Sequence, residues 1–186
     1  MKLRSAYKIL GVIPARYAST RLPGKVLADI CGKPMIQHVY ERALRALCLT
    51  GLVVATDDRR VLEAVRAFAG DGAAVMTSPE HPNGSSRAAE AMGKKNVGGG
   101  DPDAVINIQG DEPLLDPAMI DEVAEALFSG PDVVCSTLCR PMEAEADRKN
   151  PNAVKVVLGQ NGDALYFSRS PILTKRSEER RVGKEC

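Results

Sequence analysis

Short apolar segments alternate with longer amphipathic segments along most of this 186-residue chain, and this alternation constrains the fold more than any other feature. The apolar segments have the length of buried strands, and the amphipathic ones have the apolar spacing of helices. The expected strands are Lys8–Pro14, Leu52–Thr56, Ala73–Thr77 and Ala104–Gln109, and the expected helices are 34–47, Arg59–Ala69, Asn83–Lys95 and Pro117–Phe128. Strands that alternate with helices predict βαβ units, and therefore an α/β fold with a mostly parallel sheet flanked by helices.

The first expected helix has a well-defined apolar face. Pro34 suits the first turn of a helix, where its missing N–H costs nothing. The apolar residues that fall on one face are Met35, Ile36, Val39, Ala43, Leu44 and Leu47.

The C-terminal part of the chain departs from the alternation. Asp132–Leu138 has the apolar character of a fifth strand. Two further expected strands, Ala153–Leu158 and Ala164–Phe167, are joined by Asn161-Gly162, which is a typical hairpin turn. This pair predicts the start of an antiparallel extension of the sheet.

Charge and composition exclude several classes of protein. Lys and Arg number 25 against 24 Asp and Glu, a net charge of +1, which argues against nucleic-acid binding by bulk charge. No apolar run approaches the roughly 20 residues of a membrane span, and the N-terminus lacks the pattern of a signal peptide. The five cysteines are irregularly spaced, as expected of reduced thiols without zinc. We expect a cytoplasmic protein that binds neither nucleic acid nor membranes.

The last residues do not share the pattern of the rest. Residues 1–172 are predicted to form one domain, and residues 173–186 a tail outside it. Eight of the thirteen residues 174–186 are charged, and the segment has no amphipathic stripe. We interpret the tail as non-native or disordered; a native basic tail is the alternative.

The loop after the first expected strand is rich in cations. It contains Arg16, Arg21 and Lys25, together with Gly24 and the hydroxyl of Ser19. Ligands of parallel sheets bind at the carboxyl ends of the strands, so cations and backbone amides here suit a polyphosphate. The loop matches neither the dinucleotide-binding nor the P-loop pattern, so side chains must bind the phosphates. The alternative is a solvated basic loop.

The fourth expected strand ends in Gln109-Gly110-Asp111-Glu112-Pro113. A carboxylate at this edge, facing a basic loop, suits a Mg²⁺ ion shared with phosphate oxygens. Asp111 is the better ligand candidate, because strand alternation turns Glu112 the other way. The alternative is that both carboxylates cap a turn before Pro113.

Several motifs together resemble those of the 3-deoxy-D-manno-octulosonate (Kdo) cytidylyltransferases, in order and at similar spacing. They are Ile13-Pro-Ala-Arg-Tyr-Ala-Ser-Thr-Arg-Leu-Pro-Gly-Lys25, Gly32-Lys-Pro-Met-Ile36, Val54-Ala-Thr-Asp57, Gln109-Gly-Asp-Glu-Pro113, Asn150-Pro-Asn-Ala-Val-Lys-Val-Val157 and Ala164-Leu-Tyr-Phe-Ser-Arg169. The resemblance covers about residues 8–172. It implies a Rossmann-like nucleotidyltransferase fold of the glycosyltransferase-A type.

The resemblance also implies an activity and a set of site residues. The expected reaction transfers CMP from CTP to Kdo, releases diphosphate and supplies lipopolysaccharide synthesis, with Mg²⁺ as cofactor and a homodimer as the intact form. Catalysis would rest on Arg16, Lys25 and Asp111, with Asp111 as metal ligand. CTP would be bound by Arg16, Ser19, Lys25, Ser85 and Arg87, and the sugar by Gln109 and Arg169.

Two departures from the family pattern matter. Asn83-Gly-Ser-Ser-Arg87 stands where the family has Ser-Gly-Thr-(Glu/Asp)-Arg, so Ser86 replaces an acidic residue. The match ends near Ile172, before the part that would supply a second acidic metal ligand. We therefore expect a C-terminally truncated chain with little activity.

Two other functions stay open at this point. A cytidylyltransferase acting on sialic acid shares the Pro14-Ala-Arg16 start, although its loop usually continues with Gly-Gly-Ser-Lys instead of the Tyr17–Arg21 segment found here. A fragment that binds the nucleotide without catalysis is the second alternative.

Overall fold

The computed structural model describes residues 6–18, 22–94, 100–142 and 144–172. The chain forms two compact units, Met1–Thr137 and Leu138–Cys186, and each is described by itself. The expected tail at 173–186 lies outside the described residues, so its nature stays a prediction.

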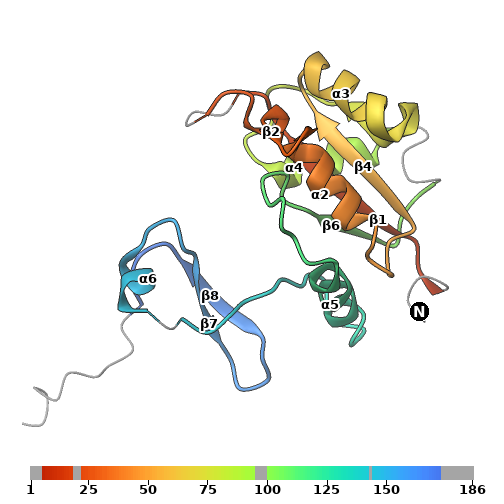
Figure 1. The fold of residues 1–186 in the computed structure, drawn as a ribbon. Helices are drawn as coiled ribbons and strands as arrows, with labels where there is room; N and C mark the ends of the chain where they lie inside the picture. The colour runs from red at the N-terminus through yellow and green to blue at the C-terminus, as the bar shows by residue number, and fades with distance from the viewer. Residues whose placement is uncertain (1–5, 19–21, 95–99, 143, 173–186) are drawn as a thin grey trace, which may run out of the picture. The chain divides into compact units, whose positions relative to one another are not determined.

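A parallel sheet forms the centre of the first unit (Figure 1). Its strands are β1 (Ile9–Ala15), β4 (Gly51–Thr56), β5 (Ala74–Met76) and β6 (Ala104–Asn107). They are ordered β5-β4-β1-β6, and every neighbouring pair is parallel. The expected α/β fold, with strands at these four places, is confirmed.

Both faces of this sheet are covered, because alternate residues of the central strands are apolar on each side. Ile9, Ile13 and Val54 pack with apolar residues of helices α2 (Met35–Ala43), α3 (Arg59–Ala69) and α5 (Pro117–Leu127). Leu10, Val12, Val53 and Ala55 pack on the other face against α4 (Gly84–Met92). Each fully buried aliphatic side chain of this kind contributes roughly 1.5–3 kcal/mol.

Side chains cap three of these helices. Asp58, Asn83 and Asp116 accept hydrogen bonds from the first-turn amides of α3, α4 and α5. Caps of this type stabilise a helix by about 1 kcal/mol each.

The helix α2 ends earlier than its apolar pattern predicts. It stops at Ala43, and the chain continues in tight turns in which Arg45 and Ala46 donate to the carbonyls three residues before them. Leu44 and Leu47 therefore lie beyond the helix and are 57% and 60% exposed, and the expectation that they continue its apolar face is wrong. The helical period cannot reveal where the backbone leaves the helix.

The expected strand at Asp132–Leu138 is also wrong. These residues have no strand conformation, and Val134 is 92% exposed. A strand needs a neighbour that completes its hydrogen bonds, and none of the described strands pairs with this segment.

Short elements connect β1 with α2. The 3-10 helix η1 (Lys25–Leu27) precedes the two-residue strands β2 (Asp29–Ile30) and β3 (Lys33–Pro34), which pair antiparallel. Their turn consists of Cys31 and Gly32, both with positive φ, as a type I′ hairpin turn requires. A second 3-10 helix, η2 (Asp71–Ala73), leads into β5.

The second unit contains a short helix, α6 (Glu145–Lys149), and an antiparallel hairpin. The hairpin pairs β7 (Lys155–Leu158) with β8 (Ala164–Ser168), which confirms the expected strand pair. Gly162 adopts a φ of 87° in the turn, a conformation that favours glycine. In the described part of both units, no helix is long and apolar enough to cross a membrane.

Candidate active site

The carboxyl ends of the four parallel strands lie at one edge of the sheet, where α/β folds bind their ligands. Arg16 directly follows β1, and Asp57 directly follows β4. Thr77 follows β5, and the segment leading to Asp111 follows β6. The fold therefore gathers polar residues from four distant parts of the sequence at one edge.

Lys25 and Asp111, separated by 86 positions, form an ion pair at this edge. The distance from Lys25 Nζ to Asp111 Oδ2 is 2.8 Å, and the two side chains are 34% and 48% exposed. An exposed pair of this kind contributes only about 0–1 kcal/mol to stability. Both groups can therefore exchange this partner for a charged ligand at little cost to the fold.

The basic loop is closed at its base. Gly24 N–H donates to the Tyr17 carbonyl at 2.8 Å, so the two ends of the segment between them meet. Gly24 has a φ of +71°, and a Cβ there would lie 3.0 Å from the Tyr17 ring. This closure places Arg16 and Lys25 at the two ends of the loop. Ser19, Thr20 and Arg21 lie outside the described residues.

Two motif glycines pack against the end of β1. A Cβ on Gly110 would lie 2.8 Å from the Pro14 carbonyl oxygen, and one on Gly84 would lie 3.2 Å from Pro14 Cγ. Because neither glycine has a side chain, the segments that carry Asp111 and Ser85 can approach Pro14 closely. Ser85 is exposed in the first turn of α4.

Arg16 is half-buried beside the loop that follows β5. Its guanidinium donates from Nη2 to the carbonyl oxygen of His81. Arg16 forms no ion pair with any other described residue. Its charge is thus held in place by a neutral acceptor and is available to an anionic ligand.

Arg87 is placed differently from the other predicted site residues. It is fully buried, and it pairs through Nη2 with Asp57 Oδ2 at 2.6 Å and donates through Nη1 to Thr77 Oγ1 at 2.5 Å. Its Nε has no partner among the described residues. Arg87 therefore ties α4 to the carboxyl ends of β4 and β5, and in this arrangement its guanidinium does not face solvent.

The two expected sugar-binding residues lie in different units. Gln109 is exposed just after β6 in the first unit. Arg169 is exposed in the second unit, where its Nη1 donates to the Pro151 carbonyl at 3.2 Å.

Lys155 is buried, whereas its place in the sequence suggests a surface position on a strand. It is only 5% exposed, and its Nζ donates to the carbonyls of Asn150 and Arg169. A buried ammonium needs such acceptors, and this one fixes the backbone at Arg169.

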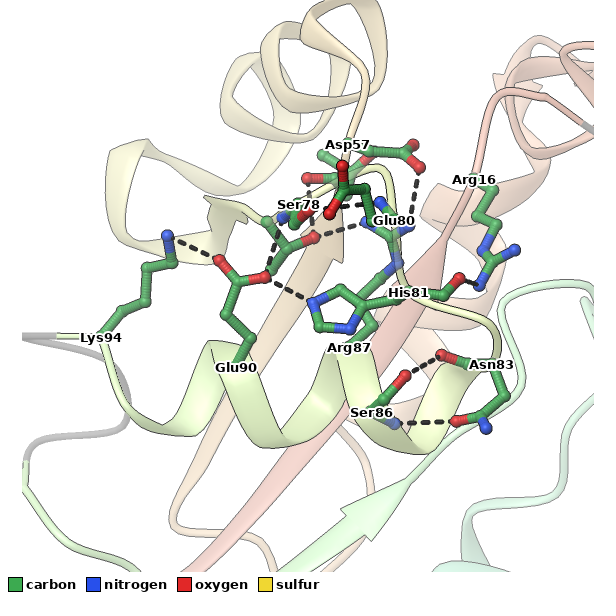
Figure 2. A network of polar contacts seen from close by, with 12 residues as sticks. Arg16, Asp57, Ser78, Glu80, His81, Asn83, Ser86, Arg87, Glu90 and Lys94 are labelled. Atoms are coloured by element: carbon green, nitrogen blue, oxygen red, sulfur yellow. Dashed lines mark hydrogen bonds and ion pairs between the residues drawn. The ribbon is translucent and has the colours of Figure 1, made fainter.

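Sequence reasoning missed one polar network (Figure 2). Neither His81 nor Glu90 belongs to any of the sequence motifs named above. In the structure His81 Nε2 and Glu90 Oε2 form a hydrogen bond of 2.5 Å, and the His81 carbonyl holds Arg16. The available signal was the position of Glu90, three residues after Arg87 on α4, which places both on one helical face.

The acidic residues at this edge can supply only a small part of the ligands of a metal ion. Among the described residues, no three His, Cys, Asp or Glu side chains form a metal-binding group. Asp111 nevertheless offers an exposed carboxylate oxygen beside a lysine. This arrangement fits a Mg²⁺ ion that takes most of its ligands from substrate phosphates and water.

The carboxyl edge of the sheet has the charges of a phosphate-binding site. A parallel sheet flanked by helices, with cations and a carboxylate at its carboxyl edge, is a Rossmann-like domain built to bind a phosphorylated ligand.

Comparison with known proteins identifies the family of this domain. The family model described as Cytidylyltransferase matches residues 10–183, so the chain belongs to the cytidylyltransferase family. A 3-deoxy-manno-octulosonate cytidylyltransferase of Geobacter metallireducens is 52% identical over 165 residues, which are 89% of this chain and 62% of the relative. The protein of the same name from Syntrophus aciditrophicus is 46% identical over 95% of this chain and 69% of its own length.

A solved structure agrees in fold as well as in sequence. It is the CMP:2-keto-3-deoxy-manno-octonic acid synthetase complexed with CTP, with a TM-score of 0.83 and 47% identity. The alignment covers 93% of this chain and 68% of that one. The chain thus spans about two thirds of the length of these relatives. The family resemblance and the Rossmann-like nucleotidyltransferase fold expected from the motifs are confirmed.

Proposed function

We propose that the protein transfers CMP from CTP to Kdo and releases diphosphate. The observation that carries the proposal is the pair of Lys25 with Asp111 at the carboxyl edge of the sheet, in a chain whose relatives bear the name of this activity. The hydroxyl oxygen at the anomeric carbon of the sugar attacks the α-phosphorus of CTP and loses its proton. The bond to the β-phosphate breaks, and diphosphate leaves.

Arg16 and Lys25 bind and neutralise the triphosphate in this reaction. They stand at the two ends of the closed loop, and positive charge fixed where negative charge moves onto diphosphate lowers the barrier. Lys25 exchanges Asp111 for a phosphate oxygen at small cost, because its ion pair is half-exposed. Ser19 and Ser85 contribute hydroxyl donors to CTP.

Asp111 would hold a Mg²⁺ ion together with phosphate oxygens, and the ion would supply further charge neutralisation. Arg87 supports the CTP site from within, by holding Asp57 and Thr77 at the ends of β4 and β5. Gln109 and Arg169 bind the acidic sugar. We place this activity in the cytoplasm, in lipopolysaccharide synthesis, and in a homodimer.

Transfer of label from α-³²P-CTP tests the proposal. The chain is incubated with Mg²⁺ and either Kdo or N-acetylneuraminate, and labelled sugar is separated from CTP. We expect slow labelling of Kdo and none of N-acetylneuraminate. Labelling of N-acetylneuraminate alone would establish the sialic acid activity instead. Binding of CTP with no labelled sugar would establish a non-catalytic nucleotide-binding chain.

A further inference from the structure

Three donors converge on the carboxylate of Glu90, which lies on α4 and is 26% exposed (Figure 2). Its Oε2 accepts from Ser78 N–H at 2.8 Å and from His81 Nε2–H at 2.5 Å. Its Oε1 pairs with Lys94 Nζ at 2.9 Å. Glu90 therefore fastens the loop Ser78–His81 to α4 at both ends of the loop.

Among the described backbone hydrogen bonds, none attaches residues 78–81 to a helix or a strand. The residues of this loop belong to neither a helix nor a strand, and a connecting segment without backbone pairing is ordered only by such anchors. Among the described residues, the contact that links this loop to the phosphate-binding cations Arg16 and Lys25 is the hydrogen bond from Arg16 to the His81 carbonyl. The position of the Arg16 guanidinium thus depends on the position of His81.

Glu90 is unsuited to contact the nucleotide itself. Its two oxygens already accept three donors, and its negative charge would repel a triphosphate. The contacts of Glu90 hold the loop Ser78–His81 in place instead.

We propose that Glu90 is a positioning residue for Arg16 and acts through the His81 loop. The inference rests on the proposed function, because it concerns the residue that binds the CTP phosphates. The inference adds that phosphate binding by Arg16 depends on the carboxylate of Glu90, which contacts the His81 ring while Arg16 contacts the His81 carbonyl.

A double-mutant cycle with CTP tests the coupling. Calorimetry measures CTP affinity of the unaltered chain and of the variants Glu90→Gln, Arg16→Ala and the two combined. We expect Glu90→Gln to weaken CTP binding on the order of tenfold, about the loss of one charge-assisted hydrogen bond. In the Arg16→Ala background, the same change should have no further effect.

The matched control is Glu63→Gln. Like Glu90, Glu63 pairs with a cation four positions away on its own helix, at 3.0 Å from Arg59 on α3, and none of its described polar contacts involves the loop Ser78–His81. It should leave CTP affinity unchanged. An equal loss from Glu90→Gln with and without Arg16, or no loss at all while Arg16→Ala weakens binding, overturns the inference and leaves the proposed function intact.

A second readout needs no nucleotide. The side-chain NMR signal of Arg16 in arginine-labelled protein, assigned by its disappearance in Arg16→Ala, should show slowed guanidinium rotation. We expect Glu90→Gln to abolish this slowing and Glu63→Gln to preserve it. If the unaltered chain fails to bind CTP but this effect is seen, the proposed function fails and the positioning by Glu90 stands.

His81→Ala covers the case in which Glu90→Gln does not fold, as judged by loss of a cooperative thermal transition. This variant keeps the carbonyl that accepts from Arg16 and removes only the ring that Glu90 holds. We expect it to weaken CTP binding and to free the Arg16 signal. His81→Gln, which keeps a side-chain donor, should restore part of both, and an unaltered Arg16 signal in His81→Ala would overturn the inference.

Discussion

Gly110 lies so close to Pro14 that a Cβ added to it would stand 2.8 Å from the Pro14 carbonyl oxygen. This approach joins the segment after β6 to the end of β1, and it positions Asp111 beside Lys25. Because of this contact, even the single methyl group of an alanine at position 110 should disturb the fold. Gly110→Ala should force the two backbones apart, destabilise the fold by about 1–3 kcal/mol and weaken CTP binding. Urea unfolding and calorimetry measure the two effects.

Gly72→Ala is the control for that prediction, because a Cβ on Gly72 would meet nothing within 4 Å. It should change neither stability nor affinity. If Gly110→Ala behaves like Gly72→Ala, the close packing of the two segments is not required.

The buried pair of Arg87 and Asp57 should be the most sensitive ion pair in the first unit. Asp57→Asn leaves the fully buried Arg87 without its counter-charge, which should cost roughly 3–5 kcal/mol in the free energy of unfolding. Urea unfolding measures this loss. Asp71→Asn removes a 95% exposed carboxylate that pairs loosely with Arg66 and should cost less than about 0.5 kcal/mol. Equal costs for the two variants would contradict the structural role of Arg87.

Glu90 predicts a defined dependence of stability on pH. Hydrogen bonds from Lys94, His81 and the Ser78 amide lower the pKa of Glu90 from its ordinary 4.5 to about 2. Because the folded-state pKa is the lower one, ionised Glu90 stabilises the fold above pH 4.5, and this contribution is lost as the pH falls toward 2.

Thermal unfolding of the unaltered chain and of Glu90→Gln between pH 7 and pH 3 measures this contribution. The two transitions should be well separated at pH 7 and should converge as the medium becomes acidic. A separation that stays constant down to pH 3 would show that the three donors do not stabilise the carboxylate.

The thiol of Cys48 should be inert. Burial, followed by the contact with Asp121, raises the pKa of Cys48 to about 12, whereas Cys31, Cys135 and Cys139 are exposed. Thiolate is the reactive form, so alkylation at pH 8, located by mass spectrometry, should modify the exposed cysteines first. Cys48 should react only after unfolding in urea. Modification of Cys48 in the folded chain at a similar rate would show that the turn before β4 opens readily.

Local patterns predicted those parts of the fold that depend on local interactions. The strand β1 and the helix α3 appear where apolar spacing places them, because burial of one face decides both. Asp132–Leu138 shows the limit, since an apolar run becomes a strand only when another strand completes its hydrogen bonds. The early end of α2 at Ala43 likewise depends on tight turns that apolar spacing does not encode.

The candidate site could be predicted only in part. Loop chemistry and the family motifs selected Arg16, Lys25 and Asp111, and the fold brings Lys25 and Asp111 into contact. The burial of Arg87 with Asp57 could not be foreseen, because a motif identifies a residue but not the partner that its charge finds. Lys155 went unrecognised for the same reason, because its acceptors are backbone carbonyls that only the folded chain places near it. Helical spacing placed Glu90 on the same face as Arg87 but could not identify its partners in the loop Ser78–His81.

Titration with CTP in the presence of Mg²⁺ tests whether Lys25 binds the triphosphate. The unaltered chain is compared with Lys25→Ala, with Lys25→Ala combined with Asp111→Asn, and with Arg66→Ala in the last turn of α3 as control. We expect Lys25→Ala to weaken CTP binding by at least about tenfold, since it removes a phosphate contact and exposes CTP to the unpaired Asp111. In the combined variant, Asp111→Asn removes the repulsion between Asp111 and CTP but also removes a metal ligand, so little affinity should return. Arg66→Ala should bind CTP as the unaltered chain does. CTP binding of equal strength with and without Lys25 would show that this lysine does not bind the phosphates.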